Sequence, residues 1–190
     1  MKTIKNDTIS TLIIKNSKFI CLLKKINSKE EIELYLNEAK QKYKDATHYC
    51  YAYIIDNLEY ACDDNEPSGT AGIPILNVLK KNDLNHILAI VVRYFGGIKL
   101  GAGGLVRAYT NSVTNCLDKD NIKDLIIGKN IDLIFDYKLQ KQIDFICKDE
   151  HIIDKKFNED IIYNIDIKND TLDILNNLDV KIIINKDIYI

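Results

Sequence analysis

The stretch HILAIVVRYFGGIKLGAGGLVR, from His86 to Arg107, decides the fold of the first part of this chain. Its uninterrupted apolar run, His86 to Val92, is typical of a strand that is buried on both faces of a sheet. A segment rich in glycine follows, and the next apolar residues predict a helix from Leu105 to about Leu117. Because glycine reaches positive φ and permits close approach to the backbone, the stretch is predicted to be a buried strand, a glycine loop and a helix.

Residue types that are rare elsewhere are concentrated around this stretch. Both arginines, both prolines and seven of the eight glycines lie between Pro67 and Arg107. The rest of the chain is built largely from Ile, Lys, Asn, Asp and Leu. Proline fixes φ, and arginine offers a planar fork of donors that lysine cannot copy. This window is therefore the first place to look for a functional site.

Apolar patterns on either side of the window predict an N-terminal domain over residues 1–120, with the order β-β-α-β-β-α-β-α. The predicted strands before the glycine loop are Thr11–Ile14, Phe19–Leu23, His48–Ile55, Leu58–Cys62 and His86–Val92. Ser28 is expected to cap a helix that ends near Lys42. Pro74 is expected as the first residue of a second helix that ends near Lys81.

A charged connection from Asp118 to Gly128 is the predicted boundary to a second domain over residues 129–190. The predicted elements there are strands Ile131–Phe135, Ile152–Phe157, Ile161–Ile167 and Val180–Ile184, with helices Lys138–Cys147 and Thr171–Leu178. This β-α-β-β-α-β order is the ferredoxin-like order, in which two helices pack on one face of an antiparallel sheet. The predicted fold class is α+β in both domains.

Composition predicts a folded cytoplasmic protein of 190 residues. The net charge of −2 does not by itself demand a nucleic-acid or membrane partner. No apolar stretch approaches the length of a membrane span, and Met1 to Ser10 lacks a signal-peptide core. The five cysteines are dispersed without a Cys-x-x-Cys pair, which favours reduced, mostly buried thiols over zinc ligation. We therefore expect no metal, no cofactor and no membrane partner.

The glycine loop is the first candidate site. A strand that feeds a glycine-rich loop and a helix that leaves it direct backbone N–H groups into one concavity, which is a place that binds anions. The candidate residues for an anion or nucleic acid are Arg93, Gly96, Gly97, Lys99, Gly101, Gly103, Gly104 and Arg107. The loop has neither a P-loop ending nor an intact G-x-G-x-x-G pattern. The alternative is a tight strand-to-helix crossover that needs small residues, although it leaves the two arginines unexplained.

An acidic loop is the second feature, with Asp63, Asp64 and Glu66 within four residues. These carboxylates could hold a hard cation, act as general acid and base, form a solvated turn, or pair with the arginines, which is the interpretation we favour. His48, Ser68 and Thr70 are expected to line the same site. His48 and Cys50 lie on one strand face, but no orienting acid is evident, so no catalytic residue is assigned.

Three long stretches closely resemble the IMPACT family, in its bacterial, two-domain, YigZ-like branch. They are ATHYCYAY (46–53), DDNEPSGTAG (63–72) and VRYFGGIKLGAGGLVRAY (92–109). Two positions depart from the family pattern: Asn65 stands where Gly is usual and Cys62 where Ser is common. Asn tolerates left-handed backbone, so the turn is expected to survive. The resemblance implies an N-terminal domain like the second domain of ribosomal protein S5 and a ferredoxin-like C-terminal domain similar to one in translation elongation factor G.

The resemblance also suggests a role. Eukaryotic relatives regulate translation by competing for a protein that activates a stress kinase. The leading expectation is therefore a translation-associated binding protein, whose basic glycine loop contacts RNA, the ribosome or an acidic protein partner. The alternatives are an enzyme acting on a phosphorylated small molecule or nucleotide with a carboxylate or metal site, and a pure protein adaptor. We do not assign the chain as an enzyme.

Overall fold

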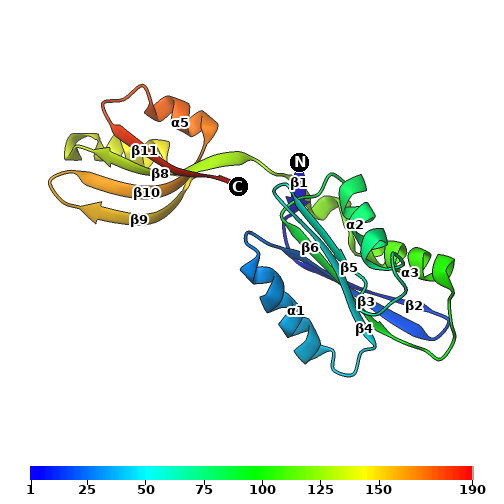
Figure 1. Ribbon diagram of the computed structural model, residues 1–190. Coiled ribbons are helices and arrows are strands. Elements are labelled where there is room, and N and C mark those ends of the chain that lie inside the picture. Colours follow the sequence, from blue (N-terminus) through cyan, green and yellow to red (C-terminus); the bar gives the residue numbers. More distant parts are fainter. Residues whose placement is uncertain (190) are drawn as a thin grey trace. The chain divides into compact units, whose positions relative to one another are not determined.

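The computed structural model describes residues 1–189, and the chain divides into two compact units. The first unit is Met1–Asp124, and the second begins at Leu125. Each unit contains helices and an antiparallel sheet, so the architecture is mixed α/β (Figure 1).

The first unit alternates strands and helices along the chain. Its elements are β1 (Lys2–Ile4), β2 (Thr8–Ile14), β3 (Ser17–Lys25), α1 (Glu30–Lys42), β4 (His48–Ile55), β5 (Leu58–Cys62), α2 (Gly72–Lys81), β6 (Ile87–Tyr94), α3 (Ala102–Cys116), the 3-10 helix η1 (Lys119–Asn121) and β7 (Ile122–Asp124). Five of the strands form one antiparallel sheet in the order β2-β3-β6-β4-β5.

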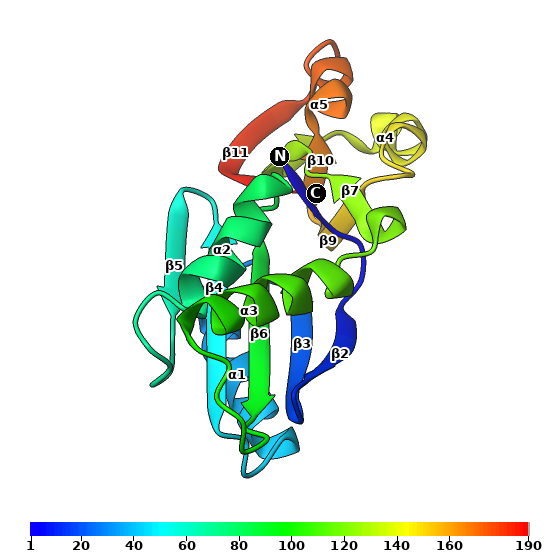
Figure 2. The ribbon, with the colours of Figure 1, turned by 90° about the vertical axis from the view of Figure 1, so that its right-hand side faces the viewer.

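Strand β6 is the centre of this sheet, and helices cover both of its faces. Leu88, Ile90 and Val92 face the core beneath α1. The alternate residues Ile87, Ala89 and Val91 face the core beneath α2 and α3. Figure 2 shows α2 and α3 on one side of the sheet and α1 behind it. The predicted two-faced burial of this strand is confirmed, because residues 87–92 are fully buried.

Some boundaries differ from the predicted ones for local reasons. Helix α2 begins at Gly72, so Pro74 is its third residue instead of its first. That position tolerates proline because the first turn of a helix has no use for its N–H groups. Helix α3 begins at Ala102, so two glycines that we assigned to the loop form its first turn. Helix α1 begins at Glu30, two residues after the expected Ser28 cap.

A short two-stranded ribbon closes the first unit. Strands β1 and β7 pair antiparallel, with Lys2 opposite Asp124 and Ile4 opposite Ile122. The sequence pattern did not predict either strand, because three residues carry no detectable periodicity. The ribbon brings the start and the end of the unit together.

The second unit follows the order β-α-β-β-α-β. Its elements are β8 (Ile127–Phe135), η2 (Tyr137–Leu139), α4 (Gln140–Ile146), β9 (His151–Phe157), β10 (Ile161–Lys168), α5 (Asn169–Leu175) and β11 (Lys181–Tyr189). The antiparallel sheet has the order β11-β8-β10-β9. Residues of β10 alternate strictly between buried and half-buried. Its buried residues join those of β8 and both helices in one core, as expected for a sheet covered on one face.

Candidate functional site

The site lies at the end of the central strand of the first unit's sheet, where β6 ends at Tyr94. Residues 95–101 then lead into α3, whose N-cap is Gly101 with a φ of 72°. A side chain is strained in that left-handed region, which accounts for glycine there. At Gly96 the reason is space, because a Cβ would lie 2.1 Å from the backbone carbon of Asn16 in the β2–β3 turn. The Ser17 hydroxyl accepts from the N–H of Gly96 at 3.1 Å and fixes the same approach.

Arg93, the last residue but one of β6, lies inside the protein. Its Nη1 donates to Oε1 of Glu66 at 2.5 Å, and the two side chains are 5% and 3% exposed. The rings of Phe19 and Phe95 lie 5.3 and 5.5 Å from the guanidinium carbon. Its Nε is buried without a hydrogen-bond partner in the described part of the chain. The expectation that Arg93 presents its charge to a ligand is therefore corrected, because the burial of β6 on both faces encloses its side chain.

Glu66 is the centre of what we call the buried polar cluster, which consists of Glu66, Arg93, Tyr109 and His48. The hydroxyl of Tyr109, on α3, donates to the same Glu66 oxygen at 2.8 Å. His48 is opposite Arg93 in the β4–β6 ladder, and its Nε2 lies 3.8 Å from Oε1 of Glu66. The pair that we favoured between the acidic loop and an arginine thus exists for Glu66 and Arg93. It ties the acidic loop, β4, β6 and α3 together.

The other two carboxylates of the acidic loop bind backbone N–H groups instead of arginines. Asp63 accepts from Gly69, Ala71 and Gly72 at 2.7, 2.9 and 2.8 Å, which folds the loop and caps the start of α2. Burial raises the pKa of Asp63, but these three bonds outweigh it and the net pKa is lowered.

Asp64 makes one structural contact through its side chain and another through its backbone carbonyl. Its Oδ2 accepts from the N–H of Tyr49 at 2.6 Å, and its carbonyl oxygen lies 2.8 Å from Nδ1 of His48. Thr70 is buried and donates to the carbonyl of Pro67 at 2.6 Å, whereas Ser68 is exposed. Asp64, His48 and Thr70 therefore support the loop.

The Cys50 thiol packs against the buried polar cluster. Its Sγ lies 3.0 Å from the carbonyl oxygen of Asp63 and 3.3 Å from the Tyr109 hydroxyl. Burial raises the pKa of Cys50 far above that of a reactive cysteine, so the group is held as a thiol. The geometry agrees with a structural cysteine and gives no nucleophile.

The exposed part of the site is what we call the glycine-loop surface, which consists of Phe95, Ile98, Lys99 and Arg107. Phe95 and Ile98 are 45% and 46% exposed, and both basic residues are exposed. Arg107 lies back over the first turn of α3, with Nη1 3.9 Å from where a Cβ of Gly103 would be. The ion pairs among residues 1–189 include neither Lys99 nor Arg107. Their charges are therefore available to a partner.

The predicted glycines take three kinds of place around this surface. Gly96 lies against the β2–β3 turn, Gly97 and Gly101 have left-handed backbone, and Gly103 and Gly104 begin α3. Helix α3 has no side-chain cap hydrogen bond at its N-terminus. The backbone N–H groups of its first turn are therefore open to an anion. Arg107 lies over this turn, and Lys99 is exposed in the loop three residues before the helix begins.

Two further findings concern the whole described chain. Among residues 1–189 no group of three or more His, Cys, Asp and Glu side chains is arranged to hold a metal ion. No helix within the same range is long and apolar enough to cross a membrane.

The fold and the site define a two-unit α/β protein that presents a basic glycine loop above a buried ion pair. The family model described as the Impact N-terminal domain matches residues 15–117. The IMPACT family member YvyE of Bacillus subtilis is 39% identical over 159 residues, which cover 78% of this chain and 73% of that protein. YigZ of Escherichia coli is 39% identical over 109 residues, which cover 55% of this chain and 53% of YigZ.

These matches identify the family. The chain belongs to the IMPACT family. A crystal structure of a hypothetical protein aligns over 97% of both chains with a TM-score of 0.71 and 24% identity, which shows a shared fold. The matched stretch contains the acidic loop, the buried polar cluster and the glycine loop, so the whole candidate site lies within the family's domain.

Proposed function

We propose that this protein is a translation-associated regulatory binding protein and that it contacts RNA through the glycine-loop surface. Membership of the IMPACT family supports the regulatory role. The family resemblance implies this role, because the eukaryotic relatives regulate translation. The site supports the contact with RNA. The proposed place of action is the cytoplasm, where RNA and ribosomes are available.

We assign the first unit to the class of the second domain of ribosomal protein S5 and the second unit to the ferredoxin-like class. The family resemblance supports the first assignment. The β-α-β-β-α-β order and the antiparallel sheet order β11-β8-β10-β9 support the second. The proposed domains are residues 1–120 and 129–190. Kinship with ribosomal modules adds weight to RNA as the ligand, although fold alone does not fix function.

The observation that carries the proposal is the pair of exposed, unpaired cations at an uncapped helix start. Arg107 lies over the first turn of α3, and Lys99 is exposed in the loop that leads into this helix. Their charged groups and the first N–H groups of the helix are donors that suit phosphate oxygens. Phe95 and Ile98 of the same loop add exposed apolar surface, and the ring of Phe95 can stack on a base. Arg93 and Glu66 act from beneath, because their ion pair holds the strand end and the loops in place.

Binding measured against salt concentration tests this proposal. We measure the binding of ribosomes and of single-stranded RNA to the wild-type chain, to Lys99→Gln with Arg107→Gln, and to Lys29→Gln with Lys40→Gln. The last variant is a charge-matched control at the N-cap and in the last turn of α1. Each lost phosphate contact is expected to make the salt slope shallower by roughly 0.7 for single-stranded RNA. If the glycine-loop variant keeps the affinity and slope of the control, the proposed contact is wrong. If the glycine-loop variant binds ribosomes more weakly but binds RNA as the wild-type chain does, the contact is with an acidic protein surface of the ribosome instead.

The alternative, an enzyme that acts on a phosphorylated small molecule, gains no support from the acidic loop. Asp63 binds backbone N–H groups, Asp64 binds Tyr49, and Glu66 pairs with Arg93. A carboxylate that is committed in this way is not free to bind a metal or accept a substrate proton. A thermal-shift screen of nucleotides with Mg²⁺ checks this conclusion, and large stabilisation that Glu66→Gln abolishes would reverse it.

A further inference from the structure

A second basic region lies at the end of the first unit away from the glycine loop. A hollow of about 550 Å³ opens between the β1–β7 ribbon, η1 and the C-terminal end of α2. Strand β6 and helix α2 both run between the two regions, since β6 begins near the hollow at Ile87 and α2 begins at the acidic loop and ends at Lys81. The two basic regions are therefore separate sites.

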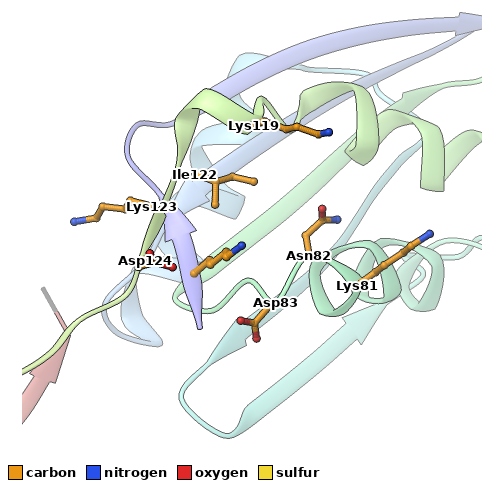
Figure 3. A pocket seen from close by; sticks show the side chains of 8 residues that line it. Lys81, Asn82, Asp83, Lys119, Ile122, Lys123 and Asp124 are labelled. Atoms are coloured by element: carbon orange, nitrogen blue, oxygen red, sulfur yellow. The ribbon is translucent and has the colours of Figure 1, made fainter.

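Four lysines from distant parts of the sequence line the hollow: Lys2, Lys81, Lys119 and Lys123. Figure 3 shows Lys119 of η1 and Lys81 of α2 on either side of Asn82, whereas Lys123 points away from them. No ion pair among residues 1–189 involves any of the four.

The acidic residues of the hollow do not cancel this charge. Asp83 and Asp124 are the two carboxylates in its lining, against four lysines, of which Lys123 points away from Lys81 and Lys119 (Figure 3). Asp83 is engaged by the amino group of Met1 at 3.2 Å. Burial and then the charge of Lys123 lower the pKa of Lys25, and Glu31 opposes this shift. The lysines of the lining thus outnumber its carboxylates and leave a net positive charge, although Asp124 is opposite Lys2 in the β1–β7 pair.

The walls of the hollow are fixed by backbone hydrogen bonds. Lys2 donates its N–H to the carbonyl of Asp83 at 2.8 Å and accepts from the N–H of Asn85 at 2.7 Å. The ammonium of Lys5 donates to the carbonyl of Asp120 at 2.7 Å and anchors η1. Lys5 is therefore a structural lysine, and the four lining lysines have no such task.

The end of α2 does not oppose an anion as strongly as a bare helix C-terminus would. The carbonyl of Val78 accepts from the side-chain amide of Asn82 at 2.8 Å, and the carbonyl of Lys80 accepts from the N–H of Asp83 at 3.0 Å. Capping of the last carbonyls removes acceptors that would repel a negative ligand.

We propose that this hollow binds a chain of phosphate groups. Lysines are point-charge donors that suit phosphate, and no aromatic residue lines the hollow for stacking of a base. The phosphates rather than the bases are thus the recognised groups. Free oligophosphate and a nucleic-acid backbone share this chemistry, and two probes separate them. The site is independent of the glycine-loop surface and of the function proposed for it.

The test measures affinity of the full chain for inorganic triphosphate by calorimetry and for a labelled uridine oligonucleotide by anisotropy. The variant is Lys81→Gln with Lys119→Gln, and the matched control is Lys29→Gln with Lys40→Gln. All four residues are exposed, so the variants are expected to fold, which circular dichroism checks. The expected loss is about tenfold for the variant, because each exposed charge pair contributes up to about fivefold.

Each result decides the matter. Weakened triphosphate binding in the variant supports a free oligophosphate, and weakened binding of the oligonucleotide alone supports a nucleic-acid backbone. The proposal is overturned if neither probe binds the wild-type chain, or if the variant binds like the control. It is also overturned if Lys99→Gln with Arg107→Gln removes triphosphate binding while the hollow variant keeps it.

Discussion

Removal of the Glu66 carboxylate is expected to destabilise the first unit strongly, although the site around it is polar. Both partners of the Glu66–Arg93 pair are nearly inaccessible to water, and the rings of Phe19 and Phe95 lie 5.3 and 5.5 Å from the guanidinium carbon. Glu66→Gln keeps the shape but removes the negative charge that balances Arg93, whose hydrogen bond to the Ser17 hydroxyl is long at 3.5 Å. Breaking a buried pair in this way costs about 3–5 kcal/mol. Because the amide oxygen can still accept, we expect a value near 3 kcal/mol.

An exposed ion pair in the same unit supplies the control. Glu59 accepts from Lys80 at 2.7 Å, but the two side chains are 41% and 51% exposed. Glu59→Gln therefore makes the same chemical change at a similar distance, and it differs in burial. We expect a loss of at most about 1 kcal/mol for this pair.

Hydrogen exchange measured by mass spectrometry is the suitable assay, because the two units can unfold separately. The peptide that covers β6 reports on the first unit, and the peptide that covers β10 serves as an internal reference. A loss of about 3 kcal/mol corresponds to a hundredfold loss of protection in β6. If Glu66→Gln costs no more than Glu59→Gln, the ion pair is not buried in solution and our account of Arg93 is wrong. Should Glu66→Gln fail to fold, Tyr109→Phe removes one donor and is expected to cost about 1 kcal/mol.

Two further predictions concern the loops. Gly96→Ala is expected to lower the unfolding free energy by about 3 kcal/mol, since the clash is with backbone. At Gly103 an added Cβ meets only the Arg107 side chain at 3.9 Å, so Gly103→Ala is expected to raise the unfolding free energy by about 0.5–1 kcal/mol. Equal urea midpoints for the two variants would contradict the packing. Because the pKa of Asp63 is lower in the folded chain than the value of about 3.9 in the unfolded chain, its ionised carboxylate stabilises the fold above that pH. This stabilisation is lost as the pH falls through the lower folded pKa. Asp63→Asn is therefore expected to cost stability at pH 7 and much less at pH 2, whereas Asp45→Asn on an exposed turn changes little at either pH, and parallel pH curves for the two variants would argue against the cap.

Much of the fold could be predicted from residue patterns, and the exceptions have physical causes. The apolar run of β6 identified a strand covered on both faces, because no residue between 87 and 92 is polar. The start of α3 was hidden by its glycines, which are poor helix formers but are tolerated where α3 begins beside a crowded turn. The β1–β7 ribbon joins segments about 120 residues apart, and no local pattern records a pairing over that distance.

The candidate site could be located from the sequence, but its inside and outside could not be separated. Arginine is almost never buried unless it is paired, and the sequence pattern groups Arg93 with Lys99 and Arg107 as candidate contacts to an anion. The face of the sheet on which Arg93 lies could nevertheless be predicted, because Arg93 continues the alternation of Ile87, Ala89 and Val91 toward the layer of α2 and α3. The partner Glu66 is 27 residues away and lies on a loop, so its position came only from the structure.

The pairing of β1 with β7 makes the first unit a self-contained module. Its first and last strands are neighbours, and every strand pair of its sheets lies within Met1–Asp124. Cleavage of the chain after Asp124 would leave the strand pairs of this unit intact. A short linker could join Met1 to Asp124, and new termini could then be introduced in another loop by circular permutation. Domains with adjacent ends tolerate such permutation and can be exchanged between genes as whole cassettes. The same unit can therefore be combined with different companion domains without redesign of its core.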